Sequence, residues 1–233
     1  MDNKLQILPV KKIEKGSNKK LEGIPDPLLK PQFLLIIVGP VRSGKGNLLV
    51  NLLENTNFGY RQFYDDTLYI SPTIENDITG TAIKKDEKIQ KISDNLEDVD
   101  LILSSIVDIK NKQQGDEKTN TLIVLDDMLG MLKQKSYFSN LCTRYRHPRI
   151  SLIVTTQSFR SLPAVCRVNA SGYIIFKTHN KKEYMKMEEE LEGNFPQFSE
   201  LYKEATEEKY NFLFLNMEKK KAYKNFDTLL WEK

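Results

Sequence analysis

One segment near the start of the chain restricts the possible folds more than any other, because it joins an apolar run, a glycine-containing turn and a helical pattern. The run FLLIIV covers residues 33–38 and has no polar position on either face. A strand of this kind is typical of the middle of a parallel sheet, where both faces are buried. The helical pattern follows as Leu48, Leu49, Leu52 and Leu53. The segment therefore predicts the first strand–turn–helix unit of an α/β domain.

Strands and helices are predicted to alternate along the rest of the chain. We expect strands at 67–70, 121–125, 150–155 and 172–176, and helices at 96–110, 137–145 with Ser136 as its cap, 182–191 and 196–205. Residues 73–93 predict a polar surface excursion, and residues 210–216 with 222–226 predict a small β-hairpin. This order indicates an α/β fold with a doubly wound, mostly parallel sheet, whose ligand site lies at the carboxyl ends of the strands.

The length and the charge distribution suit one domain with appendages. We expect a flexible basic arm at residues 1–31 and a domain at 32–233, with its core at 33–177 and a C-terminal extension at 178–233. The arm holds seven lysines and four acidic residues, which accounts for the net charge of +3. The remaining chain is formally neutral, so only a local cluster of five arginines between residues 144 and 167 indicates an anionic partner.

Neither a membrane span nor a zinc site is indicated by the sequence. No apolar run approaches the roughly 20 residues of a spanning helix, and the N-terminus lacks the apolar region of a signal peptide. We therefore expect an intracellular protein. Cys142 and Cys166 have no metal-ligand spacing, and they are predicted to be reduced, packed thiols in a helix and a loop.

The turn after the first strand, GPVRSGKG at residues 39–46, matches the phosphate-binding pattern GxxxxGK. Such a loop directs backbone N–H groups at phosphate oxygens, and its lysine, here Lys45, reaches the β and γ phosphates. Gly46 stands where serine or threonine normally contacts Mg²⁺, so weaker metal binding or slower hydrolysis is expected unless water replaces the hydroxyl. The candidate nucleotide-binding residues are Gly39, Pro40, Val41, Arg42, Ser43, Gly44, Lys45, Gly46 and Asn47. The alternative is a turn that only joins strand to helix.

Polar side chains follow two further predicted strands at the same edge of the sheet. TLIVLDD at residues 121–127 resembles the Walker B motif, in which Asp126 holds Mg²⁺ and Asp127 orients and deprotonates the attacking water. The strand ending in Thr155 and Thr156 delivers hydroxyls and Gln157, which can sense the γ-phosphate through a hydrogen bond. The alternatives are a simple turn for the acidic pair and a capping role for the glutamine.

GPVRSGKG, TLIVLDD and RHPRISLIVTTQSFRSLPAVCRVN, in this order, resemble the HerA/FtsK superfamily of ring-forming, DNA-pumping ATPases. Within that superfamily the likeness is to the poxvirus-type packaging ATPases of large DNA viruses and virophages, and it spans about residues 33–177. The resemblance implies a RecA-like sheet, a ring that is a hexamer, ATP and Mg²⁺ bound between subunits, and double-stranded DNA in the centre. It makes Lys45 the phosphate lysine, Asp126 the metal acid, Asp127 the base and Gln157 the sensor.

The resemblance also implies roles for arginines just before and just after the fourth strand. Arg146 is the candidate finger that reaches a neighbour's ATP, and Arg144 is the alternate. Arg167 lies in the family's loop after the sensor strand and is expected at the intersubunit or nucleotide side. For each of them the alternative is a solvated basic face or a salt bridge.

The implied function is an ATP-driven translocase that packages viral DNA into a preformed capsid, inside the infected cell at sites of virion assembly or associated with the virion. Two alternatives stay open. A nucleoside or small-molecule kinase also uses a phosphate loop, although Asp126 and Asp127 with Gln157 favour activation of water. A nucleotide-binding assembly subunit with little turnover is suggested by Gly46. The lysine-rich arm is a candidate contact for DNA and equally for a capsid or terminal protein.

Overall fold

A nine-stranded sheet forms the middle of the protein in the computed structural model, which describes residues 23–74, 78–92, 99–114, 119–128, 130–132 and 134–233. The strand order is β3-β2-β4-β5-β1-β6-β7-β8-β9. The strands are β1 (Leu34–Val38), β2 (Asp66–Ile70), β3 (Ile89–Ile92), β4 (Thr121–Leu125), β5 (Ile150–Thr156), β6 (Gly172–Phe176), β7 (Phe212–Asn216), β8 (Lys221–Lys224) and β9 (Thr228–Glu232). The first six are parallel to one another, and β7, β8 and β9 extend the sheet in antiparallel fashion.

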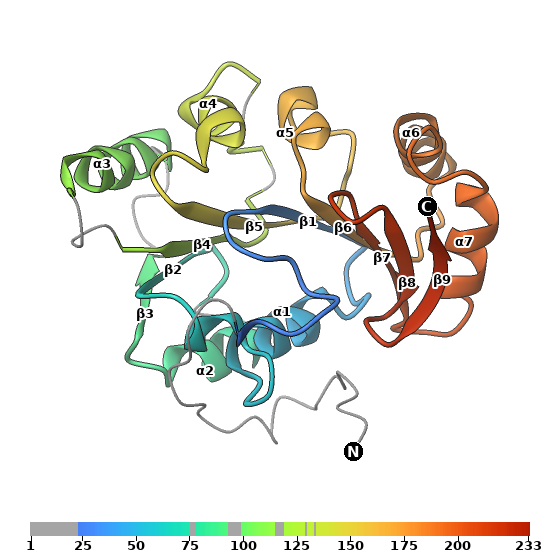
Figure 1. Ribbon diagram of the computed structural model, residues 1–233, viewed down its shortest axis with the longest axis horizontal. Coiled ribbons are helices and arrows are strands. Elements are labelled where there is room, and N and C mark those ends of the chain that lie inside the picture. The colour runs from blue at the N-terminus through green and yellow to red at the C-terminus, as the bar shows by residue number, and fades with distance from the viewer. Residues whose placement is uncertain (1–22, 75–77, 93–98, 115–118, 129, 133) are drawn as a thin grey trace.

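Helices cover both faces of this sheet (Figure 1). They are α1 (Lys45–Glu54), α2 (Ile78–Lys84), α3 (Val99–Lys112), α4 (Tyr137–Arg144), α5 (Ala164–Val168), α6 (Lys181–Leu191) and α7 (Phe198–Ala205), with a short 3₁₀ turn at Tyr60–Gln62. Side chains of α1 pack into the apolar cluster on one face, and those of α3 to α7 pack into the cluster on the other. The predicted doubly wound, mostly parallel α/β sheet is confirmed.

β1 lies between β5 and β6 because every one of its residues is apolar and must be covered on both faces. Its register pairs Leu34 with Leu152 and Val38 with Thr156, so the loops after β1 and β5 begin at the same edge. β4 is the next strand beyond β5, and Leu125 pairs with Val154. The register of the strands therefore brings the phosphate loop, the acidic pair after β4 and the polar end of β5 to the same edge of the sheet.

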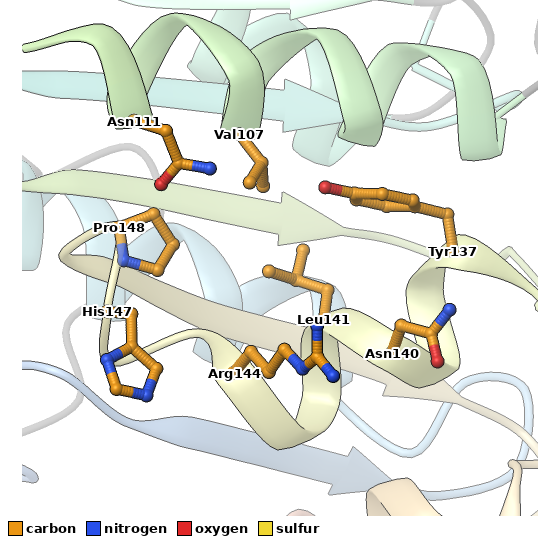
Figure 2. A pocket seen from close by; sticks show the side chains of 8 residues that line it. All are labelled: Val107, Asn111, Tyr137, Asn140, Leu141, Arg144, His147 and Pro148. Carbon is orange, nitrogen blue, oxygen red and sulfur yellow. The ribbon is translucent and has the colours of Figure 1, made fainter.

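Helices α3 and α4 lie side by side, and a small cavity of about 220 Å³ remains between them (Figure 2). α4 begins at the predicted position, because the Ser136 hydroxyl accepts a hydrogen bond from the Ser139 N–H at 3.2 Å. Among the described residues, none of the helices combines the length and the apolar character needed to cross a bilayer.

Four local predictions differ from the structure. The excursion at 73–93 contains α2 and β3, the loop at 161–169 contains α5, and β9 adds a third strand to the predicted hairpin. The helix expected at 96–110 runs on to Lys112, while its first predicted residues lie outside the described part of the chain. β3 and α5 are only four and five residues long, which is too short for a clear period in the sequence.

The last part of the predicted arm is part of the domain. Ile24, Leu28 and Leu29 are at most 2% exposed and pack under α1. The Leu29 carbonyl accepts a hydrogen bond from the Tyr60 hydroxyl at 3.1 Å, and the Pro27 carbonyl accepts one from the Asn216 side chain at 3.3 Å. Prolines prevent a helix here but do not prevent burial. The first 22 residues of the arm lie outside the described residues.

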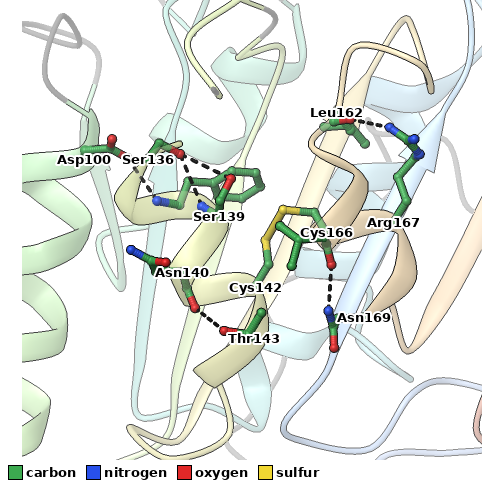
Figure 3. The surroundings of a disulfide bond; sticks show 12 residues. Asp100, Ser136, Ser139, Asn140, Cys142, Thr143, Leu162, Cys166, Arg167 and Asn169 are labelled. Atoms are coloured by element: carbon green, nitrogen blue, oxygen red, sulfur yellow. Dashed lines mark hydrogen bonds between the residues drawn. A yellow bond between two sulfur atoms is a disulfide. The ribbon is translucent and has the colours of Figure 1, made fainter. Parts of the chain in front are cut away.

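The two cysteines form a disulfide, so the prediction of two reduced thiols was wrong (Figure 3). Cys142 belongs to α4 and Cys166 to α5, and their Cα atoms are 5.2 Å apart. The two cysteines meet because α5, which was not predicted, returns the chain to the side of α4. Each cysteine is at most 1% exposed.

Candidate nucleotide site

The loop between β1 and α1 depends on two glycines for its shape. Gly44 caps α1 with φ of 108°, a left-handed conformation that side chains other than glycine adopt only with strain. At Gly39, a Cβ atom would lie 2.6 Å from the Ser43 hydroxyl and 2.8 Å from the Phe176 Cβ. The Gly39 N–H also donates to the Thr156 carbonyl at 3.1 Å. The loop is therefore held against the ends of β5 and β6.

Lys45 is half-buried under this loop. Its ammonium group donates to the carbonyls of Gly39 at 2.5 Å and of Pro40 at 2.9 Å. Burial lowers the pKa of Lys45, and the carboxylates of Asp127 and Asp126 counteract part of that shift. The hydroxyl of Ser43 is buried and has no hydrogen-bond partner among the described residues. The Lys45 cation borders the cavity beside the loop, which suits an anionic ligand.

Asp126 is fixed between the two strands that flank β4. Its N–H donates to the Ile70 carbonyl at the end of β2 at 2.9 Å. One carboxylate oxygen accepts from the Tyr69 hydroxyl at 2.5 Å, and the other accepts from the Thr155 hydroxyl at 2.5 Å. The charge of Asp126 is therefore held at a set position by β2 and β5.

Asp127 is placed by an unusual backbone conformation and by two partners on β5 and the loop after it. Its φ is 52°, in the left-handed region, and its N–H donates to the Thr155 hydroxyl at 3.0 Å. Its carboxylate accepts a hydrogen bond from the Gln157 amide at 2.9 Å. The Thr155 hydroxyl thus joins both acids, a bridging role that the sequence did not reveal.

One cavity of about 540 Å³ brings these groups together. Residues 41–47 form one wall, and Asp126, Asp127 and Gln157 form a second. Thr73, Lys209 and Tyr210 complete the lining, and none of the three was predicted. Gly39 and Pro40 lie behind the wall and hold Lys45. Lys45, Asp126 and Asp127, which were expected to meet, do border a single space.

The sequence from residue 24 to residue 225 matches the family described as poxvirus A32 protein. The chain belongs to the poxvirus A32 family. This match covers most of the chain and includes the loop, both acids and the C-terminal strands as far as β8. A search among curated proteins found no match.

Solved structures with the same fold include viral and bacterial ATPases. The genome packaging NTPase B204 from Sulfolobus turreted icosahedral virus 2, in complex with AMP, has a TM-score of 0.60 at 16% identity, over 84% of this chain and 98% of that one. The EccC protein of Thermomonospora curvata (ATPases 2 and 3) gives 0.55 at 12% identity, over 97% and 44% of the two chains. The pCW3 conjugation coupling protein TcpA with ATPγS gives 0.52 at 14% identity, over 88% and 68%. At these identities the likeness shows the P-loop ATPase fold of this A32-family chain.

The two candidate finger arginines of this A32-family chain lie away from its own cavity. Arg146 precedes β5 and Gln157 follows it, so the length of a seven-residue strand, about 20 Å, separates them. Arg146 is exposed, pairs with Glu218 at 3.0 Å and lies over the Tyr145 ring. Arg144 is exposed and lines the cavity between α3 and α4, which Tyr137 and His147 also line (Figure 2).

Arg167 does not lie on the nucleotide side, which was one of the two positions expected for it. It is 8% exposed and forms two hydrogen bonds of 2.8 Å to the Glu190 carboxylate. It also donates to the Leu162 carbonyl and lies over the Phe159 ring. These contacts fasten α5 to α6. No polar atom of Arg167 remains directed to the nucleotide cavity, whose lining does not include it.

The acids of this site suit Mg²⁺ that arrives with phosphates better than a metal held by protein alone. Within the described ranges, no group of three or more His, Cys, Asp or Glu side chains is arranged to hold a metal. Mg²⁺ in nucleotide sites is commonly held by one or two carboxylates together with phosphate oxygens and water. Asp126 beside a phosphate-binding loop fits that donor set.

Proposed function

We propose that this A32-family chain hydrolyses ATP at the subunit interfaces of a hexameric ring, and that the ring drives double-stranded DNA into a preformed viral capsid. The observation that carries the proposal is that Lys45, Asp126, Asp127 and Gln157 border one cavity large enough for a nucleotide. The structural likeness to a genome packaging NTPase supports a role in DNA packaging. The family match supports a viral setting at sites of virion assembly.

Triphosphate binding is assigned to the loop and to Lys45. The N–H groups of residues 42–46 and the start of α1 favour negative charge. When phosphate enters, Lys45 exchanges its contacts with the Gly39 and Pro40 carbonyls for phosphate oxygens. The lowered pKa of Lys45 rises on binding because the anion opposes the effect of burial.

Mg²⁺, when bound, neutralises charge on the β and γ phosphates, and Asp126 is the side chain that would hold it, directly or through water. Tyr69 and Thr155 fix the Asp126 carboxylate from two sides. Asp127 takes a proton from water as the water oxygen bonds to the γ phosphorus and the bond to the bridging oxygen breaks, releasing ADP and phosphate. Gln157 orients Asp127 through their 2.9 Å hydrogen bond.

Arg146 completes the site in trans, with Arg144 as the alternate. Both lie at the opposite edge of the sheet from the phosphate loop, so a subunit cannot use its own. In a head-to-tail ring this edge faces the cavity of the next subunit. The exposed ion pair between Arg146 and Glu218 is weak enough to open for that contact.

Phosphate release measured with and without long duplex DNA tests the proposal. We expect stimulation that increases with DNA length, its loss in Lys45→Ala, and normal activity in Lys203→Ala, an exposed position on α7. Asp127→Asn should retain ATP binding and lose at least about 100-fold in kcat, because only the proton acceptor is removed. ADP formation that ignores DNA, requires a hydroxyl acceptor and leaves the phosphoryl group on that acceptor would establish the kinase alternative. ATP binding without measurable release in the wild type would establish the assembly-subunit alternative.

A further inference from the structure

Tyr210 is an exposed aromatic residue at a polar site, and nothing in the phosphate chemistry requires it. Its side chain is among the exposed large hydrophobic residues, at 58%, although it borders the nucleotide cavity. Its Cδ1 atom lies 3.3 Å from where a Cβ on Gly44 would stand, so one edge of the ring rests on the phosphate loop. Its hydroxyl makes no hydrogen bond within the described part of the chain. The position of the ring is therefore explained neither by core packing nor by a polar contact.

The backbone holds this ring in place at some cost. Tyr210 has φ of 72°, a left-handed conformation that is strained for a residue with a side chain. Two hydrogen bonds of Asn211 close and anchor the turn: its N–H donates to the Glu208 carbonyl at 3.3 Å, and its amide oxygen accepts from Asn225 at 3.2 Å. The ammonium group of Lys209 lies 4.7 Å from the ring centroid and covers one face. A strained residue kept at a ligand cavity indicates a role in binding.

The topology gives the direction in which a nucleotide must lie. Asp126 and Asp127 follow β4, on the β5 side of β1, whereas Lys209 and Tyr210 precede β7, on the β6 side. Since hydrolysis places the γ-phosphate beside the acids, the other end of the nucleotide extends across Gly44 toward Tyr210. The ring thus lies where a base would arrive.

We propose that Tyr210 is the base-stacking residue of the nucleotide cavity, with Lys209 backing the ring, and that it gives the site a preference for purine over pyrimidine nucleotides. This inference rests on the proposed nucleotide-binding function of the cavity. Stacking uses the π face, which every base has and which is larger in purines. The face opposite Lys209 takes the base, while the phosphates are held by the loop and by the groups beside Asp126.

Equilibrium binding of ADP, CDP and inorganic pyrophosphate, each with Mg²⁺, tests the proposal on the full chain without any need for hydrolysis. In Tyr210→Ala we expect the Kd for ADP to rise about 5- to 150-fold, the range for loss of one base–aromatic stack, and the ADP-to-CDP preference to fall toward one. Pyrophosphate should bind the variant as it binds the wild type, which also shows that the loop is intact. Tyr210→Phe should stay within about twofold of wild type, because the ring face is kept.

Two results would overturn the base-stacking role: an unchanged Kd for ADP in Tyr210→Ala, or an equal loss of pyrophosphate binding. The second would mean that Tyr210 only supports the loop. Failure of the proposed function has a different pattern. If the wild type releases no phosphate with DNA but its ADP affinity still depends on Tyr210, the base site stands and the translocase does not. If the wild type hydrolyses ATP and Tyr210→Ala binds ADP normally, only the base site falls.

Discussion

Gly46 leaves the first turn of α1 without the hydroxyl that a phosphate loop normally offers to Mg²⁺. We predict that Gly46→Ser raises kcat and lowers the Mg²⁺ concentration needed for half-maximal phosphate release. One added polar contact is worth about 1 kcal/mol, or roughly a fivefold change. A Mg²⁺ titration of phosphate release at saturating ATP measures it, with Gly46→Ala as the control for a side chain without a hydroxyl. No difference between the serine and alanine variants would show that the missing hydroxyl does not limit turnover.

The residues recovered from the sequence are those whose chemistry lies in short, continuous motifs. Lys45 ends the loop that follows β1, and Asp126 and Asp127 follow β4 directly, so their meeting at one cavity was predictable from the motifs and the strand order. Tyr69, which holds Asp126, looks like an ordinary strand residue. Tyr210 comes from a turn far along the chain, in a segment with no motif, and only the folded sheet brings it to Gly44.

A buried charge cluster joins α1, the turn at Tyr60–Gln62 and the turn before β3. Arg61 lies 3.4 Å from Glu54 and 2.5 Å from Asp86, and all three side chains are at most 7% exposed. The pKa of Glu54 is raised from its ordinary 4.5 to about 7, mainly by burial; Arg61 opposes this shift, and the Asp86 carboxylate adds to it. One cation between two buried carboxylates favours a proton on Glu54.

This cluster makes stability depend on pH in a defined direction. Because the folded pKa of Glu54 lies above the unfolded value, its contribution is complete below 4.5 and is lost as the pH rises through about 7. We predict that the free energy of unfolding falls by about 1 kcal/mol between pH 6 and pH 8 through this group. Urea unfolding at both pH values measures the change, and Glu54→Gln should remove it. Glu200→Gln, at an exposed position of α7, should leave it intact; a fall of the same size in Glu54→Gln would refute the assignment.

The disulfide between α4 and α5 should also contribute measurably to stability. It closes a loop with a sequence separation of 24, and restricting such a loop in the unfolded chain is worth about 3 kcal/mol. We predict that a reductant lowers the free energy of unfolding by about that amount. The control is the double variant Cys142→Ala, Cys166→Ala, which should be less stable than wild type and insensitive to reductant. Equal stability of the wild type with and without reductant would contradict the prediction.

Strands and helices were predictable where the pattern of apolar residues was long enough to show which of the two it forms. β1, β4, β5 and β6 are rich in apolar residues and buried throughout, and each lies within one residue of its expected bounds. α2 and α5 were not predicted, for different reasons. α2 lies in a polar stretch, and α5 is a single short helix after Pro163. The disulfide could not be inferred because it depends on α5 returning to α4.

At the scale of the whole molecule, the separation of Arg146 from its own cavity predicts complementation between defective subunits. Arg146→Ala should lower kcat by about 10³-fold, the lower range for an arginine finger, with ATP binding retained. Lys45→Ala subunits keep the arginine but lack the phosphate lysine. Mixed rings should therefore recover phosphate release that neither variant shows alone.

The same mixing with Arg144→Ala identifies which arginine acts in trans, because only the true finger variant is inactive alone and rescued by Lys45→Ala subunits. Phosphate release against mixing ratio, with native mass determination of the ring in ATP and DNA, measures both effects. If neither arginine variant loses activity, the proposal of an arginine acting in trans is wrong, although the proposed nucleotide cavity is not affected. Unrescued loss would place the arginine's role within its own subunit.

Because Gly39 has no side chain, the phosphate loop packs closely against the strands that lead to the antiparallel part of the sheet. Because no Cβ intervenes, the loop rests directly on Phe176, whose ring lies 5.4 Å from that of Phe212, which in turn lies 5.0 Å from Phe226. Close-packed rings transmit displacement because they have no free volume to absorb it. A continuous row of packed aromatic rings therefore connects the phosphate loop with the antiparallel strands of the sheet.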